Sequence, residues 1–449
     1  MSSPNASIGD MISIKTGFPI KPSGMDSIRL LTYGLISNSL TPQLPKLLNF
    51  LYSPMNRQVV VTGIGIISPL ESGRGVDSFW QEALTGRDAI TQVESFDASK
   101  YECKIAGEVS DLGIGNADRW ISFLDFAFKQ ATLDAGIDAS AGDFGVCIGT
   151  VLGGILAGQK AWQALDKPFC QRQENKPALP EKYHLYSGER YLIDKYKIKG
   201  PVLTVSTACA SGTDAIGIGY RNILWGKADV MVAGGVDTLS EFAFCGFNNL
   251  KALTKTKVRP FDKNRDGLAL GEGAAFLVLE EAGSARKRGA RIYGRITGYA
   301  SRADAHHMTG PDKEGRGLAS AIKAALKEAG ISKPDYINAH GTGTIYNDAM
   351  ETKAIKLAFG KSAYKIPISS IKSMIGHSFG AGGAIEAATC LLAIKNGAIP
   401  PTINYQGKDP DCDLDYVPNI ARKADVKTAI SLSAGFGGQN AAILFGAVD

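Results

Sequence analysis

Runs of apolar residues mark a series of strands along the chain. "RQVVVTGIGIISP" (57–69) carries three consecutive valines and closes at Ser68-Pro69, which predicts a buried strand followed by a turn. "FGVCIGT" (144–150) and "ADVMVAGG" (228–235) have the same character. Helical patterns such as "DSFWQEALTG" and "SFLDFAFKQATLDAG" lie between these runs. Strands that alternate with helices predict an α/β fold with largely parallel sheets.

The same alternation returns in the second half. "RIYGRITGYASRAD" (291–304) predicts a strand, "GLASAIKAALKEAG" (317–330) an amphipathic helix, and "DYINAHGTGT" (335–344) a strand that ends in a glycine turn. "IPISSIKSMIGHSFGAGGAIEAATCLLAI" (366–394) predicts a strand, a turn and a helix. This last unit and "VLTVSTACASGTDAIG" (202–217) both lead from a β-branched strand into a helix start of small residues. The similarity suggests two related halves.

Composition narrows the class of protein. The 449 residues are 44% hydrophobic and 21% charged, which is typical of a globular chain that can bury a large core. No stretch approaches the roughly 18 uninterrupted apolar residues of a membrane helix. The net charge of +5 is too small to indicate a nucleic-acid-binding protein, but it is compatible with binding to an acidic partner. We therefore expect neither membrane nor nucleic-acid binding.

Cysteines and histidines are scattered. The seven cysteines contain no C-x-x-C pair, and none of the five histidines is spaced as a helical metal pair. This pattern fits neither a disulfide framework nor a zinc site. A reducing compartment, the cytoplasm, is the natural interpretation.

Residues 1–54 differ in character from the rest of the chain. They are rich in serine and in turn formers, and Met55 stands directly before the first strong strand. A targeting peptide, a dispensable leader and a start codon upstream of the true one are all compatible with this composition. We expect residues 1–54 to be dispensable.

Cys209 lies in "STACASG", between a predicted strand and a predicted helix. A helix N-terminus favours the thiolate and can lower a cysteine pKa from its free value of about 8.5. The small neighbours leave room for a substrate. The alternative is a small buried packing residue, which is what most cysteines are.

Three further strand ends carry residues suited to chemistry. His340 lies in "NAHGTGT" and His377 in "SMIGHSFGAGG", while Lys372 ends an apolar strand. Phe436, at the tip of "SAGFGGQNAAILF", must be exposed or line a pocket. Structural roles are open for both histidines, and a solvated strand end for Lys372. Two imidazoles that converge on one thiol would suit thioester chemistry, because they can donate hydrogen bonds to a carbonyl that becomes an enolate.

Residues 57–449 resemble the β-ketoacyl-acyl-carrier-protein synthases, the condensing enzymes of fatty acid and type II polyketide synthesis. The resemblance rests on collinear motifs, which are "VVVTGIGIISP", "VSTACASG", "ADVMVAGGVD", "RPFDKNRDGLALGEGAA", "NAHGTGT", "SSIKSMIGHSFGAGGAIEA", "PPTINY", "DLDYVPN" and "GFGGQNAAILF". It implies a thiolase fold of five layers, αβαβα, built from two similar halves. We place these halves at residues 55–289, with the nucleophile, and 290–449, with the histidine pair.

The resemblance implies a role for each motif residue. Cys209 would accept the acyl chain, and His340 and His377 would bind the malonyl thioester carbonyl and stabilise the enolate. Lys372 matches the active-site lysine, and Glu386 the glutamate that supports it.

Five more positions follow from the same motifs. Phe436 matches a gating phenylalanine whose backbone N–H, with that of Cys209, forms an oxyanion hole. Thr342, Thr344 and Thr309 fall where the phosphopantetheine arm is held, and Leu152 where acyl-pocket depth is limited.

The implied partners are an acyl carrier protein and a second subunit, in a homodimer or a heterodimer with a related chain. No metal or redox cofactor is implied, since the substrates are carried on phosphopantetheine. Basic residues at 251, 255, 257 and 259 are candidates for docking the acidic carrier, or form a solvated face.

The resemblance leaves the pathway open. Elongation in fatty acid biosynthesis is our first interpretation. A type II polyketide ketosynthase subunit working with a chain-length factor is the alternative. "HGTGT" and "SSIKSMIGHSFG" resemble polyketide ketosynthases as much as fatty acid ones, and residues 155–196 depart from the fatty acid pattern.

Three rivals share the fold. A thiolase is disfavoured by the paired histidines. A non-catalytic chain-length factor generally lacks the cysteine, and a priming malonyl decarboxylase typically has glutamine in its place.

Overall fold

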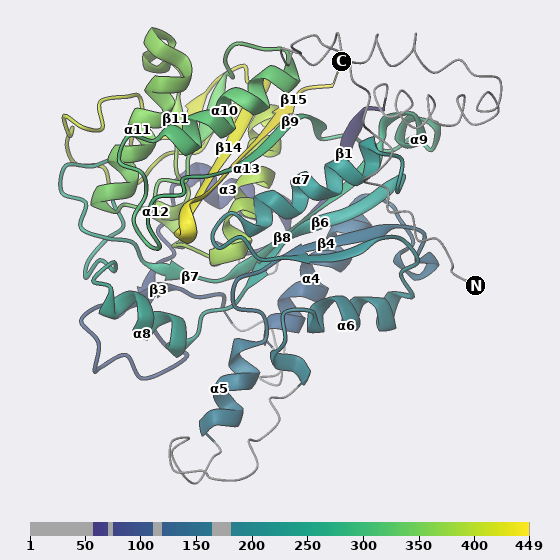
Figure 1. Cartoon of the computed structure of the whole chain (residues 1–449), viewed down its shortest axis with the longest axis horizontal. Helices are drawn as coiled ribbons and strands as arrows, with labels where there is room; N and C mark the ends of the chain where they lie inside the picture. The colour runs from purple at the N-terminus through teal and green to yellow at the C-terminus, as the bar shows by residue number, and fades with distance from the viewer. Residues whose placement is uncertain (1–56, 71–74, 111–118, 164–180, 449) are drawn as a thin grey trace, which may run out of the picture. The chain divides into compact units, whose positions relative to one another are not determined.

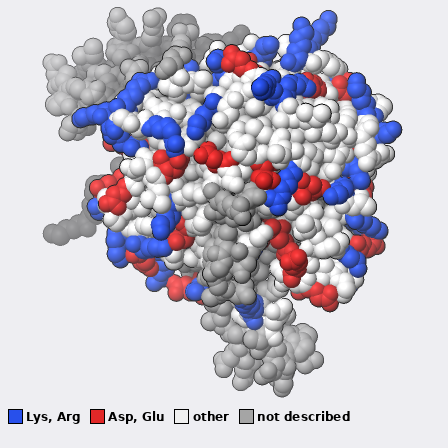
Figure 2. Space-filling model, turned by 180° about the vertical axis from the view of Figure 1, so that it is seen from behind, with Lys and Arg blue, Asp and Glu red and all other residues white. Residues whose placement is uncertain are grey.

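The computed structural model describes residues 57–70, 75–110, 119–163 and 181–448. The expected leader at 1–54 lies outside these residues. In the described part of the chain, the helices are too short or too polar to cross a membrane. On the face shown in Figure 2, basic and acidic side chains are interspersed, so the small net positive charge is not gathered there.

A mixed sheet organises the described residues (Figure 1). Its ten strands, in spatial order, are β11 (Ile368–Ser369), β10 (Tyr336–Asn338), β14 (Thr428–Gly435), β15 (Gln439–Gly446), β9 (Gly294–Ala303), β1 (Val59–Ile67), β8 (Gly273–Glu281), β6 (Val230–Asp237), β4 (Gly145–Gly149) and β5 (Val202–Val205). Two small sheets accompany it, β2 (Thr91–Gln92) with β3 (Ile105–Gly107) and β7 (Leu270–Gly271), and β12 (Ala398–Ile399) with β13 (Arg422–Lys423).

The sheet consists of two parts with the same topology. One part runs β1-β8-β6-β4-β5 and the other β9-β15-β14-β10-β11. In each part the first two pairings are antiparallel and the last two are parallel. Antiparallel pairing of β1 with β9 joins the parts. The repeat agrees with the similarity between the strand-to-helix units at 202–217 and 366–394.

The expectation of largely parallel sheets is wrong. Strands β8 and β15 each run against both of their neighbours. For β15 the reason is local, because only the short turn Phe436–Gly438 separates it from β14. A connection of that length can only reverse the chain, whereas a parallel crossover needs a dozen or more residues.

Helices form layers against the sheet. α7 (Ser211–Leu224) and α13 (Gly382–Asn396) contact each other, and each packs against strands of both parts (Figure 1). α4 (Arg119–Asp134) and α6 (Ser187–Tyr196) cover the outer face of the first part, and α10 (Arg316–Ala329) with α11 (Ile345–Phe359) that of the second. The remaining helices are α3 (Val76–Thr85), α5 (Ile155–Gln163), α8 (Glu241–Asn249), α9 (Ala282–Lys287) and α12 (Lys372–Ile375). This is the expected αβαβα order.

The sequence explains the central position of α7 and α13. Nearly every residue of α13 is apolar or small and is buried, whereas α10 is strongly amphipathic and buries one face. Small residues let the two central helices approach closely. A Cβ at Gly212 would lie 2.4 Å from the carbonyl oxygen of Gly380, so only glycine fits there. The starts of the two helices, and the turns before them, therefore meet.

Candidate active site

Cys209 sits on a tight turn between β5 and α7. The residue before it, Ala208, has a φ of +50°, in the left-handed region that residues other than glycine seldom adopt. The hydroxyl of Ser211 donates to the carbonyl of Ala208 at 2.5 Å and accepts the backbone N–H of Thr207 at 2.9 Å. The turn presents the sulfur toward the opposite half of the molecule.

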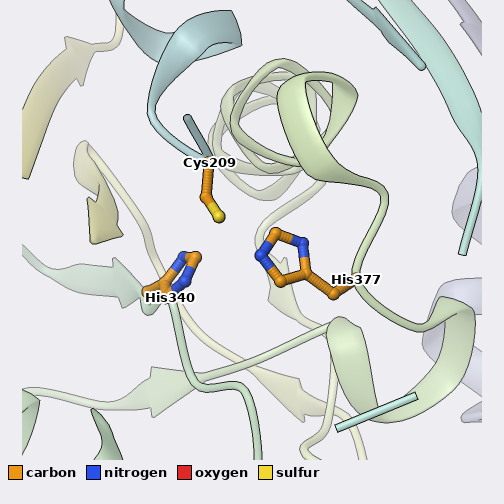
Figure 3. Close-up of side chains that lie close together, drawn as sticks. All are labelled: Cys209, His340 and His377. Carbon is orange, nitrogen blue, oxygen red and sulfur yellow. The ribbon is translucent and has the colours of Figure 1, made fainter. Parts of the chain in front are cut away.

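Two imidazoles face this sulfur (Figure 3). One ligand atom each from Cys209, His340 and His377 lies within 4.8 Å of the others, and all three residues are buried. The two rings are nearly perpendicular, with centroids 5.2 Å apart. Residues separated by up to 168 positions therefore converge on one point. They are also the one cluster in the described part of the chain that is close enough to hold a metal ion.

Hydrogen bonds orient both imidazoles. Nδ1 of His377 accepts the backbone N–H of Phe379 at 3.2 Å, and its buried Nε2 has no partner among the described residues. Nδ1 of His340 lies 3.3 Å from Nζ of Lys372, an ammonium that can only donate. Both rings are thus set to carry their proton on Nε2. Burial and the charge of Lys372 hold the pKa of each histidine well below its ordinary value, so both are neutral donors.

Lys372 is not a solvated strand end. It begins α12, is buried, and forms an ion pair with the equally buried Glu386 of α13. Burial raises the pKa of Glu386 to about 7, and the lysine opposes that rise. The prediction that His377 directly follows a strand is also wrong. β11 is only two residues long, and α12 stands between it and His377.

The pKa of the Cys209 thiol is higher than we expected. Burial raises its pKa to about 11, although Lys372 and the backbone N–H groups of Phe436 and Cys209 lower it. The expectation of a pKa below the free value is therefore wrong. Desolvation of the thiolate outweighs its stabilisation by the helix N-terminus. The thiolate loses more solvation free energy on burial than it gains from Lys372 and the two N–H groups.

Phe436 lies beside the cysteine at the start of the turn Phe436–Gly438. Its half-buried ring stacks on that of Phe247, with centroids 5.4 Å apart. Its backbone N–H, like that of Cys209, is directed at the sulfur. Two N–H groups beside a nucleophile are the geometry of an oxyanion hole.

A cavity of about 340 Å³ opens onto the three residues. Phe436 and the three predicted threonines, Thr309, Thr342 and Thr344, line it. The hydroxyls of Thr342 and Thr344 lie 2.9 Å apart. The cavity lining also includes Lys251 but not Leu152, Lys372 or Glu386.

Leu152 belongs instead to a neighbouring apolar cluster that contains Phe247 and Phe379. Phe379 also stacks on His377, with centroids 5.9 Å apart. Leu152 therefore shares an apolar cluster with Phe247, which lines the same cavity as Cys209.

Two buried carboxylates near the site are not among the residues that the sequence motifs indicated. Glu351 accepts the backbone N–H groups of His340 and Gly341 at 2.7 and 2.8 Å, and burial raises its pKa to about 8. Asp237 accepts the N–H groups of Leu152 and Gly380 at 2.8 and 2.7 Å. Asp237 ends the apolar run "VMVAGGVD", which was a weak signal, whereas Glu351 lies among polar residues and carries no local signal.

Two family models match the chain. Residues 56–285 match the model described as "Beta-ketoacyl synthase, N-terminal domain", and residues 293–406 match "Beta-ketoacyl synthase, C-terminal domain". Together these matches span most of the described residues.

Individual relatives include a polyketide synthase subunit and a 3-oxoacyl-[acyl-carrier-protein] synthase. The chain is 41% identical to the tetracenomycin polyketide synthase ketoacyl synthase alpha subunit of Streptomyces glaucescens, over 86% of this chain and 97% of that protein. It is 40% identical to 3-oxoacyl-[acyl-carrier-protein] synthase 2 of Coxiella burnetii, over 87% of this chain and 99% of that protein.

Solved structures agree with these relatives. One is a type II polyketide synthase acyl-carrier protein in complex with its ketosynthase bound to the hexaketide. Its TM-score is 0.81 and its sequence identity 35%, and the match covers 87% of this chain and 100% of that chain. Another is the ishigamide ketosynthase/chain length factor, with a TM-score of 0.80, 35% identity, and coverage of 88% and 100%.

These findings confirm the resemblance and the thiolase fold. The cysteine, the two neutral imidazoles and the buried lysine lie together on the scaffold that such enzymes share. The chain therefore belongs to the β-ketoacyl synthase family of acyl-transferring condensing enzymes.

Proposed function

We propose that this enzyme elongates acyl chains by decarboxylative condensation with malonyl-acyl-carrier protein, and that Cys209 carries the growing chain. The observation that carries the proposal is the convergence of Cys209, His340 and His377 at the base of one cavity. A nucleophile and two neutral hydrogen-bond donors are what the two half-reactions require.

The first half-reaction transfers the acyl group. The sulfur of Cys209 attacks the carbonyl carbon of an acyl thioester, the bond to the carrier thiol breaks, and the proton of Cys209 ends on that departing thiol. The N–H groups of Cys209 and Phe436 stabilise the oxyanion of the tetrahedral intermediate. No net charge is created, which suits a buried thiol.

The second half-reaction generates the carbon nucleophile. Malonyl thioester occupies the cavity with its carbonyl oxygen near Nε2–H of His340 and His377. The carbon–carboxylate bond breaks, carbon dioxide leaves, and the electron pair passes into an enolate. The two neutral imidazoles stabilise its oxygen, and losing one such donor typically costs on the order of 100- to 1,000-fold in rate.

Condensation completes the cycle. The enolate carbon attacks the carbonyl of acyl-Cys209, the bond to sulfur breaks, and the β-ketoacyl chain stays on the carrier protein. The released thiolate takes a proton from solvent. The cycle consumes the two thioester substrates and one proton. Both acyl groups arrive on carrier-bound phosphopantetheine, which Thr309, Thr342 and Thr344 would hold along the cavity.

The pathway has two candidates. Fatty acid elongation agrees with the 3-oxoacyl-[acyl-carrier-protein] synthase relatives. A polyketide role with a chain-length factor is favoured by the polyketide alpha-subunit relative and by neighbours solved with such a factor. The test is to extend carrier-bound acyl chains of graded length and to measure the product masses. Extension of saturated acyl chains supports the fatty acid role, and formation of poly-β-keto chains supports the polyketide role.

The carrier protein and a second subunit are proposed partners. Among the candidate docking residues, Lys251 is exposed and lines the cavity, whereas Lys255 and Lys257 form ion pairs with Glu102 and Asp88 at 2.7 and 2.6 Å. Lys251 is therefore the best placed to meet an acidic carrier.

The proposed location of the enzyme is the cytoplasm. The described cysteines are free, which agrees with a reducing compartment.

The open edge strand β5 is the proposed subunit interface. β5 has a hydrogen-bonded neighbour on one side only within the described residues, and its Leu203 is 37% exposed. The buried hydroxyl of Thr204 finds no partner within the same residues. Exposed strand edges pair readily with another chain, so a second ketosynthase-like subunit is expected there.

The nucleophile is tested by acyl transfer. Incubation with acyl-carrier protein should add one acyl mass to the wild type and none to Cys209→Ala, as measured by intact-mass spectrometry. Cys209→Gln should release carbon dioxide from malonyl-carrier protein without condensation, because the histidines remain. An acyl adduct on Cys209→Ala would contradict the nucleophile, and a Cys209→Gln variant without decarboxylation would contradict the role of the histidines.

A further inference from the structure

The turn that carries Cys209 stores backbone strain. Ala208 occupies the left-handed region, which is unfavourable for residues other than glycine. A conformation of this kind persists only where its surroundings hold it. Ser211 holds one side of the turn, through its bonds to Thr207 and Ala208.

The side chain of Thr207 holds the other side. Its hydroxyl donates to Oδ2 of Asp214 at 2.6 Å. Asp214 lies one turn along α7 and is 2% exposed, with no cation among its hydrogen-bond partners in the described structure. A buried carboxylate without a cation is costly, so it needs several hydrogen-bond donors.

Those other donors come from the second half of the chain. The hydroxyl of Tyr299, on β9, donates to Oδ1 of Asp214 at 2.8 Å, and the hydroxyl of Ser301 also hydrogen-bonds to this carboxylate. The Tyr299 ring lies against Gly217 of α7, where a Cβ would approach it within 2.3 Å. The carboxylate therefore ties the turn before α7 to a strand of the opposite half.

We propose that Asp214 is a positioning residue, which fixes the Cys209 turn by holding the Thr207 hydroxyl against β9. A carboxylate only accepts hydrogen bonds, so it can take all three hydroxyls at once, and no other side chain of similar size offers as many acceptor sites. The role rests on the proposed function of Cys209 as acyl acceptor.

Loss of this contact should affect one half-reaction more than the other. Release of Thr207 lets the strained turn relax, which moves both the sulfur and the N–H of Cys209. Acyl transfer uses these two groups. Malonyl decarboxylation depends on His340 and His377, which lie on other elements. A change confined to the turn should therefore slow acyl transfer selectively.

The test compares two threonine-to-valine substitutions in the full-length protein. Thr207→Val removes the hydroxyl that reaches Asp214. The matched control, Thr213→Val, removes a hydroxyl that joins α7 to Ser433 at 2.8 Å, and Thr213 is fully buried whereas Thr207 is partly buried. Each variant is measured for acylation of Cys209, decarboxylation of malonyl-carrier protein, and melting midpoint.

Thr207→Val should slow acylation by about 10- to 100-fold, because small misplacements of reacting atoms have effects of that size. Its decarboxylation should stay within about threefold of wild type, and Thr213→Val should keep both rates within that range. Asp214→Ala should slow acylation at least as much as Thr207→Val, because it also removes the acceptor of Tyr299 and Ser301. Adding Thr207→Val to Asp214→Ala should cause no further loss, since the threonine hydroxyl then has no carboxylate to bond.

Three results would overturn the proposal. Acylation by Thr207→Val could equal that of Thr213→Val. Both half-reactions could fall in equal proportion, which a general loss of structure would produce. A wild type that accepts no acyl group would overturn the proposed function and this role together. If Asp214→Ala does not fold, the two valine variants decide the matter alone.

Discussion

A buried nucleophilic thiol must be shielded from water and yet be accessible to its substrate, and Cys209 meets both requirements. Burial keeps the sulfur protonated and away from water, and raises its pKa to about 11. The small residues of the turn and the cavity give a thioester access to the same atom. The arrangement favours attack on a bound thioester over reactions that need a free thiolate.

This balance predicts the pH dependence of Cys209 alkylation. Because the folded pKa lies above the usual cysteine value, the thiolate stays a minor species at neutral pH. The alkylation rate with iodoacetamide should then rise about tenfold per pH unit from pH 7 to 10 without a plateau, since the thiolate is the reactive form. Intact-mass spectrometry measures the rate, with Cys209→Ala correcting for the other cysteines. A plateau below pH 9 would show that the thiol is more acidic than its burial implies.

At the scale of elements, the crossing of α7 and α13 decides how far the cysteine lies from His377. The helices approach closely where Gly212 meets the carbonyl of Gly380 and the backbone nitrogen of Ala384, at 2.4 and 2.9 Å from a Cβ position. Backbone atoms, unlike the ends of flexible side chains, cannot rotate away from an added Cβ atom. A side chain at Gly212 must therefore separate the helices.

Gly212→Ala should consequently destabilise the fold and slow condensation. Overpacking of this kind typically costs about 1–3 kcal/mol. Activity should fall by about tenfold or more, as Cys209 moves from the imidazoles. Gly246→Ala on α8 is the control, because its Cβ would meet nothing within 4 Å. Calorimetry and product formation measure the two effects. An unchanged melting midpoint for Gly212→Ala would show that the crossing is looser than the structure indicates.

At the scale of the whole molecule, the repeated topology explains where the site forms. Each part of the sheet contributes one central helix, α7 or α13, and the turns before these helices meet. Cys209 comes from the first part, and His340, Lys372 and His377 from the second. Neither part alone holds the chemistry.

The open edge of β5 gives a prediction at the same scale. Leu203→Lys should shift the assembled protein toward monomer, because a charge on an edge strand opposes pairing with another chain. Leu357→Lys on α11, where the leucine is 49% exposed, is the matched control and should leave the mass unchanged. Analytical ultracentrifugation measures the mass. Equal masses for wild type and Leu203→Lys would place the interface elsewhere.

The sequence predicted local features well. The strands at 59–67, 145–149 and 230–237, and the helix at 316–329, fall within two residues of the runs that indicated them. The turn with Phe436 was also found, because glycines and flanking apolar strands are local signals. The motifs brought together Cys209, His340, His377 and Lys372, which the structure places around one point.

Other features could not be read locally. The carboxylates of Asp214, Asp237 and Glu351 are ordinary acidic residues in the sequence. Each acts through hydrogen bonds to groups brought near by folding. The direction of β8 depends on its place between β1 and β6, which no property of its own residues specifies.

The sequence by itself determined the elements, the family and the residues suited to thioester chemistry, because these depend on periodicity and on side-chain type. The tertiary structure alone decided their electrostatic states. It made both histidines neutral and Lys372 a buried partner of Glu386, and it raised the pKa of Cys209 rather than lowering it. The physical reason is that burial and distant charges set ionisation, and both come into being only when the two halves pack together.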